Sequence, residues 1–528
     1  MIYTGWQGEE LELKNAEGRV VKFKFGVFLI ILLLFFGLFF VSVAVAQADR
    51  LVLEWEQHWE TYGKGGCCNF GTHNFFVGDV DGDGVLEMVT GGIMYHVSED
   101  VRGEAEAPFR IWTWDGENFK LEASENWPGA IFSIYAADLN GDGSTEIILG
   151  ARIANATGYY ASLRVLSWNN EVLTLRASYE GTSVNSVFVS DVDGDGLAEI
   201  LTVGRGDEDT QSLTQLRLWQ LEGDKLVLKE IMQWGGLDGA SANSVYAADL
   251  DNDGEIEIVT CGYDGEVENS RGQIRVWRWD GEAVSLEGSM EWCTIEEGFG
   301  VDIAGNPLGN TVVNNVKCGD VDGDGTSEIV TGGFTYDGEK VDAQLAIWNW
   351  TGKSLLREDS FEWADADITE VKSISLDDVD GDGREEIVTS GFIGVYGGFS
   401  DNEEDFPEHA QLRVWKWNGE ELALKAGKDW VIGEGVTGWN IGTGDLDGDG
   451  VTEIVTVGCM YESSLCDPDL RVWSLPREQE HLPYALIITV TMAAFFALGI
   501  LFFFGRKRVR KNDGRVSACC CLATVTYP

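Results

Sequence analysis

The sequence predicts an all-β chain: a seven-bladed β-propeller closed by an N-terminal strand and flanked by hydrophobic transmembrane or signal helices. Three observations predict this fold class. An acidic loop, Asp-x-Asp/Asn-x-Asp-Gly-x-x-Glu, recurs seven times at spacings of 53 to 71 residues. Each copy lies within the same succession of strand-like segments, and an orphan strand precedes the first copy. The period is too long for one hairpin and suits a four-stranded sheet, which indicates a propeller or an array.

Each loop carries the oxygen atoms that a hard divalent cation needs on a sharply turning stretch of backbone. Side-chain oxygens occupy positions 1, 3 and 5, glycine permits a turn at position 6, position 7 offers its carbonyl, and glutamate stands at position 9. An EF-hand needs a glutamate at position 12 and flanking helices, but position 12 here is Thr90, Leu149 or Thr202, within strand-like runs. A solvated acidic turn explains poorly why these offsets repeat in seven places.

The loops therefore predict up to seven structural Ca²⁺ ions. The predicted ligands, in chain order, are Asp79, Asp81, Asp83, Val85 and Glu87; Asp138, Asn140, Asp142, Ser144 and Glu146; Asp191, Asp193, Asp195, Leu197 and Glu199; Asp249, Asp251, Asp253, Glu255 and Glu257; Asp320, Asp322, Asp324, Thr326 and Glu328; Asp378, Asp380, Asp382, Arg384 and Glu386; and Asp445, Asp447, Asp449, Val451 and Glu453.

The neighbours of each loop predict the four strands of a blade. An apolar strand A such as Val184–Ser190 precedes the loop, and a strand B such as Glu328–Gly332 follows it. Strand C carries Arg-Val-Trp-x-Trp or a relative of it, as in Arg413–Trp417, and a turn then leads to an alternating strand D such as Leu422–Lys425. Because the paired tryptophans are two positions apart, they share one face of the strand, where we expect them to pack between blades.

The chain ends predict how the propeller closes. The seventh copy stops after strand C at Arg471–Trp473, whereas Leu51–Trp55 precedes the first loop and has the pattern of a strand D. We expect this orphan strand to complete the last blade, which would protect a sheet edge.

The repeats resemble the FG-GAP or VCBS-type repeats of the integrin α-subunit propeller and its prokaryotic relatives. The resemblance covers about residues 50–475. It implies a seven-bladed propeller with calcium in the loop between strands A and B. This sequence departs from the family in using Glu, where the family has Asp, at the ninth position throughout, and it lacks room for integrin leg domains.

Hydrophobic segments on both sides predict where the propeller lies. Residues 26–46 fit a signal peptide or a signal-anchor helix, and residues 1–25 are a cytoplasmic segment or precede a true start near Val20. Residues 483–504 fit a transmembrane helix, and residues 505–528 form a basic cytoplasmic tail. We expect the propeller, residues 50–475, on the extracytoplasmic side of a cell membrane, crossed once or twice by the chain.

The net charge and the lengths of the loops limit which binding partners are plausible. A net charge of −52 makes nucleic acid and anionic glycans poor partners. The distal insertions His96–Pro108, Gly298–Asn310 and Gly394–Glu408 are expected to bind an extracellular protein or glycan, although tolerated surface insertions explain them almost as well.

The predicted function is adhesion or recognition. No histidine-based motif, nucleophile elbow or phosphate-binding loop is present, so the chain is expected not to be an enzyme, with no catalytic and no organic-cofactor residues. Two alternatives stay open. One is a calcium-dependent polysaccharide lyase or hydrolase, and the other is a lectin that uses distal aromatics such as Tyr95, Tyr159 or Tyr396.

Ten cysteines suit an oxidising exterior without fixing their pairing. Cys459 with Cys466, and Cys293 with Cys318, are the pairs that could form disulfides.

Overall fold

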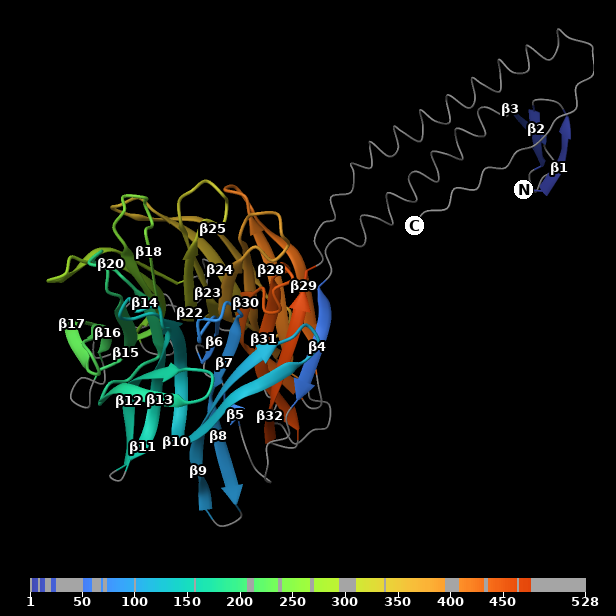
Figure 1. Ribbon diagram of the computed structural model, residues 1–528. Helices are drawn as coiled ribbons and strands as arrows, with labels where there is room; N and C mark the ends of the chain where they lie inside the picture. Colours follow the sequence, from blue (N-terminus) through green and yellow to red (C-terminus); the bar gives the residue numbers. More distant parts are fainter. Residues whose placement is uncertain are drawn as a thin grey trace, which may run out of the picture. The chain divides into compact units, whose positions relative to one another are not determined.

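The described part of the molecule is built from β-strands and turns. The computed structural model describes residues 2–7, 10–14, 20–24, 51–58, 68–69, 74–98, 101–155, 158–206, 213–235, 240–265, 270–293, 310–336, 339–394, 408–431, 435–462 and 465–475. Within these ranges no residue is helical (Figure 1). The prediction of an all-β chain is confirmed.

The chain divides into two compact units, Met1–Arg477 and Glu478–Pro528, and the second lies outside the described residues. The predicted membrane or signal segments 26–46 and 483–504, and the basic tail 505–528, also lie outside them. In the described ranges no helix is long and apolar enough to cross a membrane. The first residues form an antiparallel sheet that the sequence analysis did not predict, with strands β1 (Ile2–Gln7), β2 (Glu10–Lys14) and β3 (Val20–Lys24).

Seven four-stranded repeats follow, and each strand pairs with the next in antiparallel fashion. Repeats 1 and 2 share one long strand, β10. The strands of repeats 1 to 3 are β6 (Phe75–Gly78), β7 (Glu87–Gly91), β9 (Val101–Trp114) and the first half of β10 (Phe119–Ala137); the second half of β10, β11 (Glu146–Asn155), β12 (Gly158–Trp168) and β13 (Leu173–Glu180); and β14 (Ser186–Ser190), β15 (Glu199–Arg205), β16 (Thr214–Leu221) and β17 (Leu226–Trp234).

Repeats 4 to 7 have the same order. Their strands are β18 (Ala240–Ala248), β19 (Glu257–Asp264), β20 (Arg271–Trp279) and β21 (Val284–Trp292); β22 (Asn310–Gly319), β23 (Glu328–Tyr336), β24 (Val341–Trp350) and β25 (Leu355–Trp363); β26 (Ile368–Asp377), β27 (Glu386–Gly394), β28 (His409–Trp417) and β29 (Leu422–Trp430); and β30 (Gly435–Gly444), β31 (Glu453–Glu462), β32 (Leu465–Ser474) and β4 (Val52–His58). A single parallel pair, Val341 with Ile368, joins the sheets of repeats 5 and 6.

The continuity of β10 depends on one glycine. Residues 119–128 pair with β9 and residues 129–137 pair with β11, so Gly129 marks the change from one repeat to the next. Its φ is 137°, and a Cβ there would lie 2.0 Å from the Arg152 carbonyl oxygen. Only glycine fits this close backbone approach.

The first strands of consecutive repeats contact one another in order, from β6 through β10, β14, β18, β22 and β26 to β30, and β30 in turn contacts β6. A hydrogen bond from Asn440 Nδ2 to Asn74 Oδ1, 2.9 Å long, joins the seventh repeat to the first. At the outer edge of the seventh sheet, β4 pairs with β32. The predicted pairing of the orphan strand with the last repeat is confirmed.

Tryptophans fill the spaces between repeats, as predicted. The first tryptophan of the strand C motif donates its indole N–H to the threonine at loop position 12 in six repeats, at 2.9–3.2 Å. From repeat 4 onward, this ring also lies against a tryptophan that ends strand D of the preceding repeat. These pairs, with centroids 4.7–5.1 Å apart, are Trp234 with Trp277, Trp292 with Trp348, Trp363 with Trp415, and Trp430 with Trp473.

The structure describes one of the three predicted distal insertions and little of the other two. The segment His96–Pro108 is not an irregular loop, because β8 (Ile93–Ser98) pairs with β9 as a hairpin, and the short β5 (Cys68–Asn69) pairs with β8. Residues 298–309 and 395–407 of the other two insertions lie outside the described residues, as do the side chains of Tyr95, Tyr159 and Tyr396.

Candidate metal centres

The acidic loops join the first strand of each repeat to the second. In repeat 1 the loop runs from Asp79 to Glu87, between β6 and β7. Gly84 at position 6 has a φ of 89°, and the equivalent glycines of the other repeats have φ values of 84° to 93°. Because glycine has no Cβ, it adopts this left-handed conformation without strain, which explains its fixed place in the motif.

Two hydrogen bonds within each loop orient its carboxylates. In repeat 1 the Gly84 N–H donates to Asp79 Oδ2 at 3.0 Å, and the Val85 N–H donates to Asp83 Oδ1 at 2.8 Å. The equivalent bonds in the other six loops are 2.7–3.0 Å long. Backbone donors therefore hold the aspartates of positions 1 and 5 in the same arrangement seven times.

The glutamate at position 9 begins the second strand of each repeat and is at most 3% exposed. Its Oε2 accepts the backbone N–H of position 2, at 2.9 Å from Val80 to Glu87 and at 2.8–3.2 Å in the other loops. The second oxygen, Oε1, has no hydrogen-bond donor in Glu87, whereas in Glu199 it accepts from Gln220 Nε2 at 3.4 Å. Each buried glutamate thus gives one oxygen to the backbone, and in Glu87 the other oxygen is left without a protein donor.

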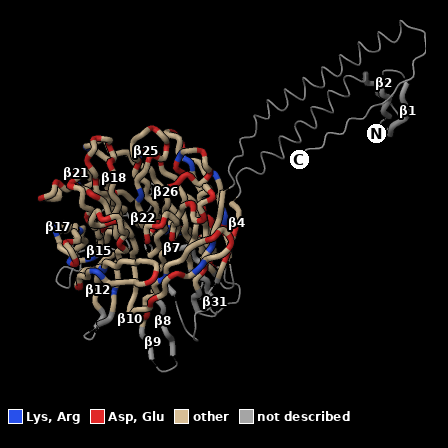
Figure 2. The backbone as a smooth tube through the Cα atoms, viewed as in Figure 1, with Lys and Arg blue, Asp and Glu red and all other residues tan. Residues whose placement is uncertain are grey.

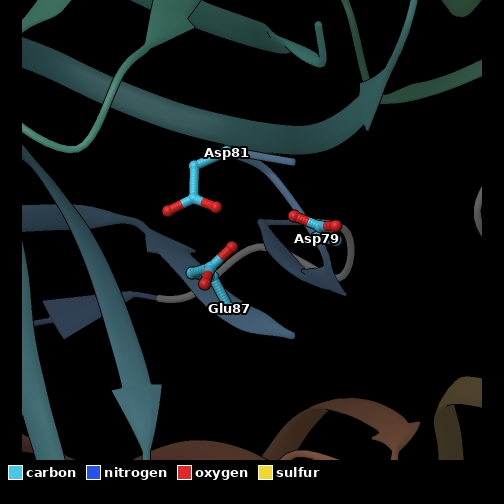
Figure 3. Close-up of side chains that lie close together, drawn as sticks. All are labelled: Asp79, Asp81 and Glu87. Atoms are coloured by element: carbon cyan, nitrogen blue, oxygen red, sulfur yellow. The ribbon is translucent and has the colours of Figure 1, made fainter. Parts of the chain in front are cut away.

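The carboxylates of a loop converge on one point. In Figure 3, Asp79, Asp81 and Glu87 lie close together, and one oxygen of each lies within 4.8 Å of the others. In the described residues the same three positions converge in at least four further loops, at Asp191, Asp193 and Glu199; Asp249, Asp251 and Glu257; Asp320, Asp322 and Glu328; and Asp378, Asp380 and Glu386.

Several of these buried oxygens lack a protein donor. Oδ1 of Asp251, Asp320 and Asp445 has no hydrogen bond, although buried acceptors are normally satisfied. A set of hard carboxylate and carbonyl oxygens is the coordination that Ca²⁺ takes. The loop residues therefore fit calcium, and the assignment of each ligand stays a prediction.

Without a bound cation, the charged form of the position 9 glutamates is disfavoured. Burial, followed by repulsion from the loop aspartates, raises the pKa of Glu87, Glu199, Glu257 and Glu453 to about 7, against an ordinary value of 4.5. Burial likewise raises the pKa of Glu328 to about 8. A bound divalent ion would favour the charged form and release these protons.

These shifts predict how the metal-stripped chain responds to pH. Between pH 4.5 and about 7 the folded state keeps protons that the unfolded state has already released, so stability falls as the pH rises through this window. We expect the unfolding midpoint of the metal-stripped chain to be lower at pH 8 than at pH 5, and calcium to reduce this difference. Calorimetry at both pH values measures it, and a metal-free midpoint that rises from pH 5 to pH 8 would contradict the expectation.

The seven loops differ in the side chain opposite the position 9 glutamate. This residue lies on strand C, directly before Trp114 in repeat 1 and Trp168 in repeat 2, and is Thr113 and Ser167 respectively. In repeat 6 it is Lys416, whose Nζ lies 3.0 Å from Asp380 Oδ2 and 3.1 Å from Glu386 Oε1.

A second ammonium group reaches the same loop of repeat 6. Lys425, from strand D, forms an ion pair with Asp380, and Lys416 also pairs with Asp382. The sequence analysis missed both lysines because it treated the seven loops as equivalent. The signal was present, since the x of Trp-x-Trp faces position 9.

We expect these lysines to weaken calcium binding in repeat 6, because the ammonium groups use the oxygens that the ion needs. The double substitution Lys416→Met with Lys425→Met should therefore add one calcium ion per chain at limiting calcium. Atomic emission on the full-length chain after gel filtration measures the number bound. The control is Lys353→Met, an exposed lysine in a turn of repeat 5. An equal count in the wild type, the control and the double variant would refute this.

The acidic charge extends beyond the loops. Figure 2 shows Asp and Glu along most of the described sheets, with fewer Lys and Arg. Bound calcium would relieve part of the repulsion within this surface.

The predicted disulfide between Cys293 and Cys318 is wrong. Both residues are free, and Cys318 is buried on β22 in an apolar cluster that also contains Cys261. In the seventh repeat, Cys466 stands opposite Tyr461 and Cys459 opposite Pro468 in the strand register, and the side chains of both cysteines lie outside the described residues.

Comparison with known proteins supports the repeat assignment. The family described as FG-GAP-like repeat matches residues 191–260 and 378–456. These two segments are FG-GAP-like repeats. They contain the loops of repeats 3, 4, 6 and 7, which share their hydrogen-bond pattern with the other three. A search of curated proteins found no match.

Among solved structures, the chain is similar to a Bacillus licheniformis rhamnogalacturonan lyase, PL11. The identity is 14%, the TM-score is 0.33, and the match covers 78% of this chain and 92% of the lyase. The expectation that the chain is not an enzyme is corrected by this finding, because the similar structure is an enzyme. At this identity and TM-score the likeness assigns no activity to the chain.

Proposed function

We propose that the seven repeats form a closed, calcium-stabilised seven-bladed propeller that acts as an extracytoplasmic recognition module anchored to a cell membrane. The observation that carries this proposal is the sevenfold repetition of one loop hydrogen-bond pattern, with a buried glutamate in each repeat and convergent carboxylates in at least five of them. The contact between β30 and β6, and the pairing of β4 with β32, support closure.

Calcium has a structural role in this proposal. Each ion cross-links the turn between the first two strands and neutralises carboxylates that would otherwise repel one another. Extracellular calcium modules bind with Kd values of about 10⁻⁴–10⁻³ M, which suits loops exposed to calcium outside the cytoplasm. The hydrophobic segments 26–46 and 483–504 are the sequence features that support membrane anchoring.

The recognition surface is proposed at the end of the repeats away from the calcium loops. There the connections between second and third strands, and between fourth and first strands, vary most in length, as loops that carry binding sites commonly do. A protein or a neutral glycan fits this strongly acidic chain better than an anionic polymer.

The test uses the full-length chain, immobilised in millimolar calcium and applied to glycan and protein arrays. We expect retention of a defined protein or neutral glycan that a chelator abolishes and that deletion of residues 395–407 weakens. If no protein or glycan of the arrays is retained in calcium, the recognition role is rejected. If chromatography shows that the chain shortens a polysaccharide in a calcium-dependent way, a catalytic role replaces the recognition role.

A further inference from the structure

The seven first strands surround a cavity of about 220 Å³ that is separate from the calcium loops. Its lining includes one residue from the same position of every repeat, three before the first loop aspartate: Phe76, Tyr135, Phe188, Tyr246, Lys317, Ser375 and Gly442. A water occupies about 30 Å³ of liquid, so the cavity has room for about seven waters. It is smaller than the pockets of about 300–1,000 Å³ that take drug-sized ligands, so its ligand must be small.

Four aromatic rings make one wall of this cavity. The centroids of Phe76 and Tyr135 are 5.2 Å apart, those of Tyr135 and Phe188 are 4.9 Å apart, and those of Phe188 and Tyr246 are 4.2 Å apart. The equivalent residues of repeats 6 and 7 are Ser375 and Gly442, which carry no ring. The lining of the cavity is therefore asymmetric, with aromatic rings on the strands of repeats 1 to 4 and none at the equivalent positions of repeats 5 to 7.

One cation ends the aromatic arc. Lys317 Nζ lies 5.1 Å from the centroid of the Tyr246 ring. Among the described residues that line the cavity, Lys317 is the sole charged side chain, and no carboxylate of the described ranges forms an ion pair with it. Burial lowers the pKa of Lys317 to about 8, because the surroundings of its ammonium group replace water poorly.

Polar groups lie beside the arc. Two residues earlier in the strands, Ser186, Ser244 and Asn315 line the cavity together with their counterparts in other repeats. These hydroxyl and amide groups can donate to a ligand oxygen. The full lining thus combines one ammonium, an aromatic wall and neutral hydrogen-bonding groups.

We propose that this cavity binds a small organic carboxylate, whose anionic group pairs with Lys317 and whose ring or apolar face lies against the aromatic arc. A metal cation is disfavoured by the ammonium group. A bare inorganic anion would leave the aromatic wall without a partner, and a neutral apolar molecule would leave the ammonium unpaired, which is costly in a partly desolvated site.

The experiment uses 4-fluorobenzoate as the probe and ¹⁹F NMR on the full-length chain in calcium and 150 mM salt. Bound probe should show a displaced fluorine resonance, because the ring lies beside four aromatic side chains. Lys317→Met should weaken binding at least about tenfold, the loss expected for removing one charge-assisted hydrogen bond. The control Lys225→Met removes an exposed lysine in a turn of repeat 3 and should leave binding unchanged.

A second comparison uses the unaltered protein, so it does not depend on the folding of a variant. The neutral analogue 4-fluorobenzyl alcohol should bind at least about tenfold more weakly than the carboxylate. Equal binding of the two probes, equal binding by Lys317→Met and wild type, or an undisplaced fluorine resonance at millimolar protein would each overturn the proposal. These results are independent of the array experiment above.

Discussion

Removing calcium will lower the unfolding midpoint of the full-length chain by at least about 10 °C. At a 10- to 100-fold excess of free calcium over Kd, each occupied loop gains about 1.4–2.7 kcal/mol. Several loops together then approach the whole free energy of unfolding of a typical protein, about 5–15 kcal/mol. Stability changes of this size move the midpoint of a large domain by many degrees.

Calorimetry in 10 mM calcium and in excess chelator measures this shift. Magnesium is the matched control, because it is smaller, prefers octahedral coordination and keeps its waters, so it should restore little of the loss. A transition that chelator leaves in place would show that the seven loops do not stabilise the fold through an ion.

Replacing Trp348 with alanine will destabilise the chain by about 3–5 kcal/mol, the usual loss for a large buried aromatic. Trp348 is 1% exposed, lies 4.7 Å from Trp292 of the preceding repeat, and donates its indole N–H to Thr331 Oγ1 at 2.9 Å. The substitution opens a cavity between repeats 4 and 5 and leaves Thr331 without this donor.

Urea unfolding in calcium measures the loss. Leu356→Ala is the control: Leu356 lies nearby on β25 but is 52% exposed, so its change should stay within about 0.5 kcal/mol. Trp348→Phe keeps an aromatic ring and removes the indole N–H, so it should cost less than alanine. Equal stability of Trp348→Ala and the control would mean that the interface between repeats contributes little.

Features encoded by a few adjacent residues could be predicted from the sequence. The acidic loop has oxygens at fixed offsets and a glycine at position 6, so all seven loops, and the second strands that begin at their glutamates, were predicted where the structure has them. The orphan strand β4 was predicted because it is the one strand D pattern that lacks its own loop.

Features that depend on contacts between repeats were not predicted. The fourth strands run on to Trp234, Trp292, Trp363 and Trp430, beyond the short alternating segments, because these tryptophans pack on the next repeat. The free Cys318 follows from its place in a buried apolar cluster, which the spacing of cysteines does not show. The cavity arises because one position from each of seven distant strands meets at a common centre, and no local pattern reports that meeting.

The pairing of β4 with β32 has a consequence for biosynthesis. About 400 residues separate the two strands, so β4 leaves the ribosome long before its partner exists. At about 5–20 residues per second, translation alone leaves it waiting for about 20–80 s with an unpaired edge. Nascent chains of this protein therefore expose an unpaired strand edge that could pair with a neighbouring polypeptide. For the chain to fold by itself, β4 must stay unpaired until β32 has left the ribosome.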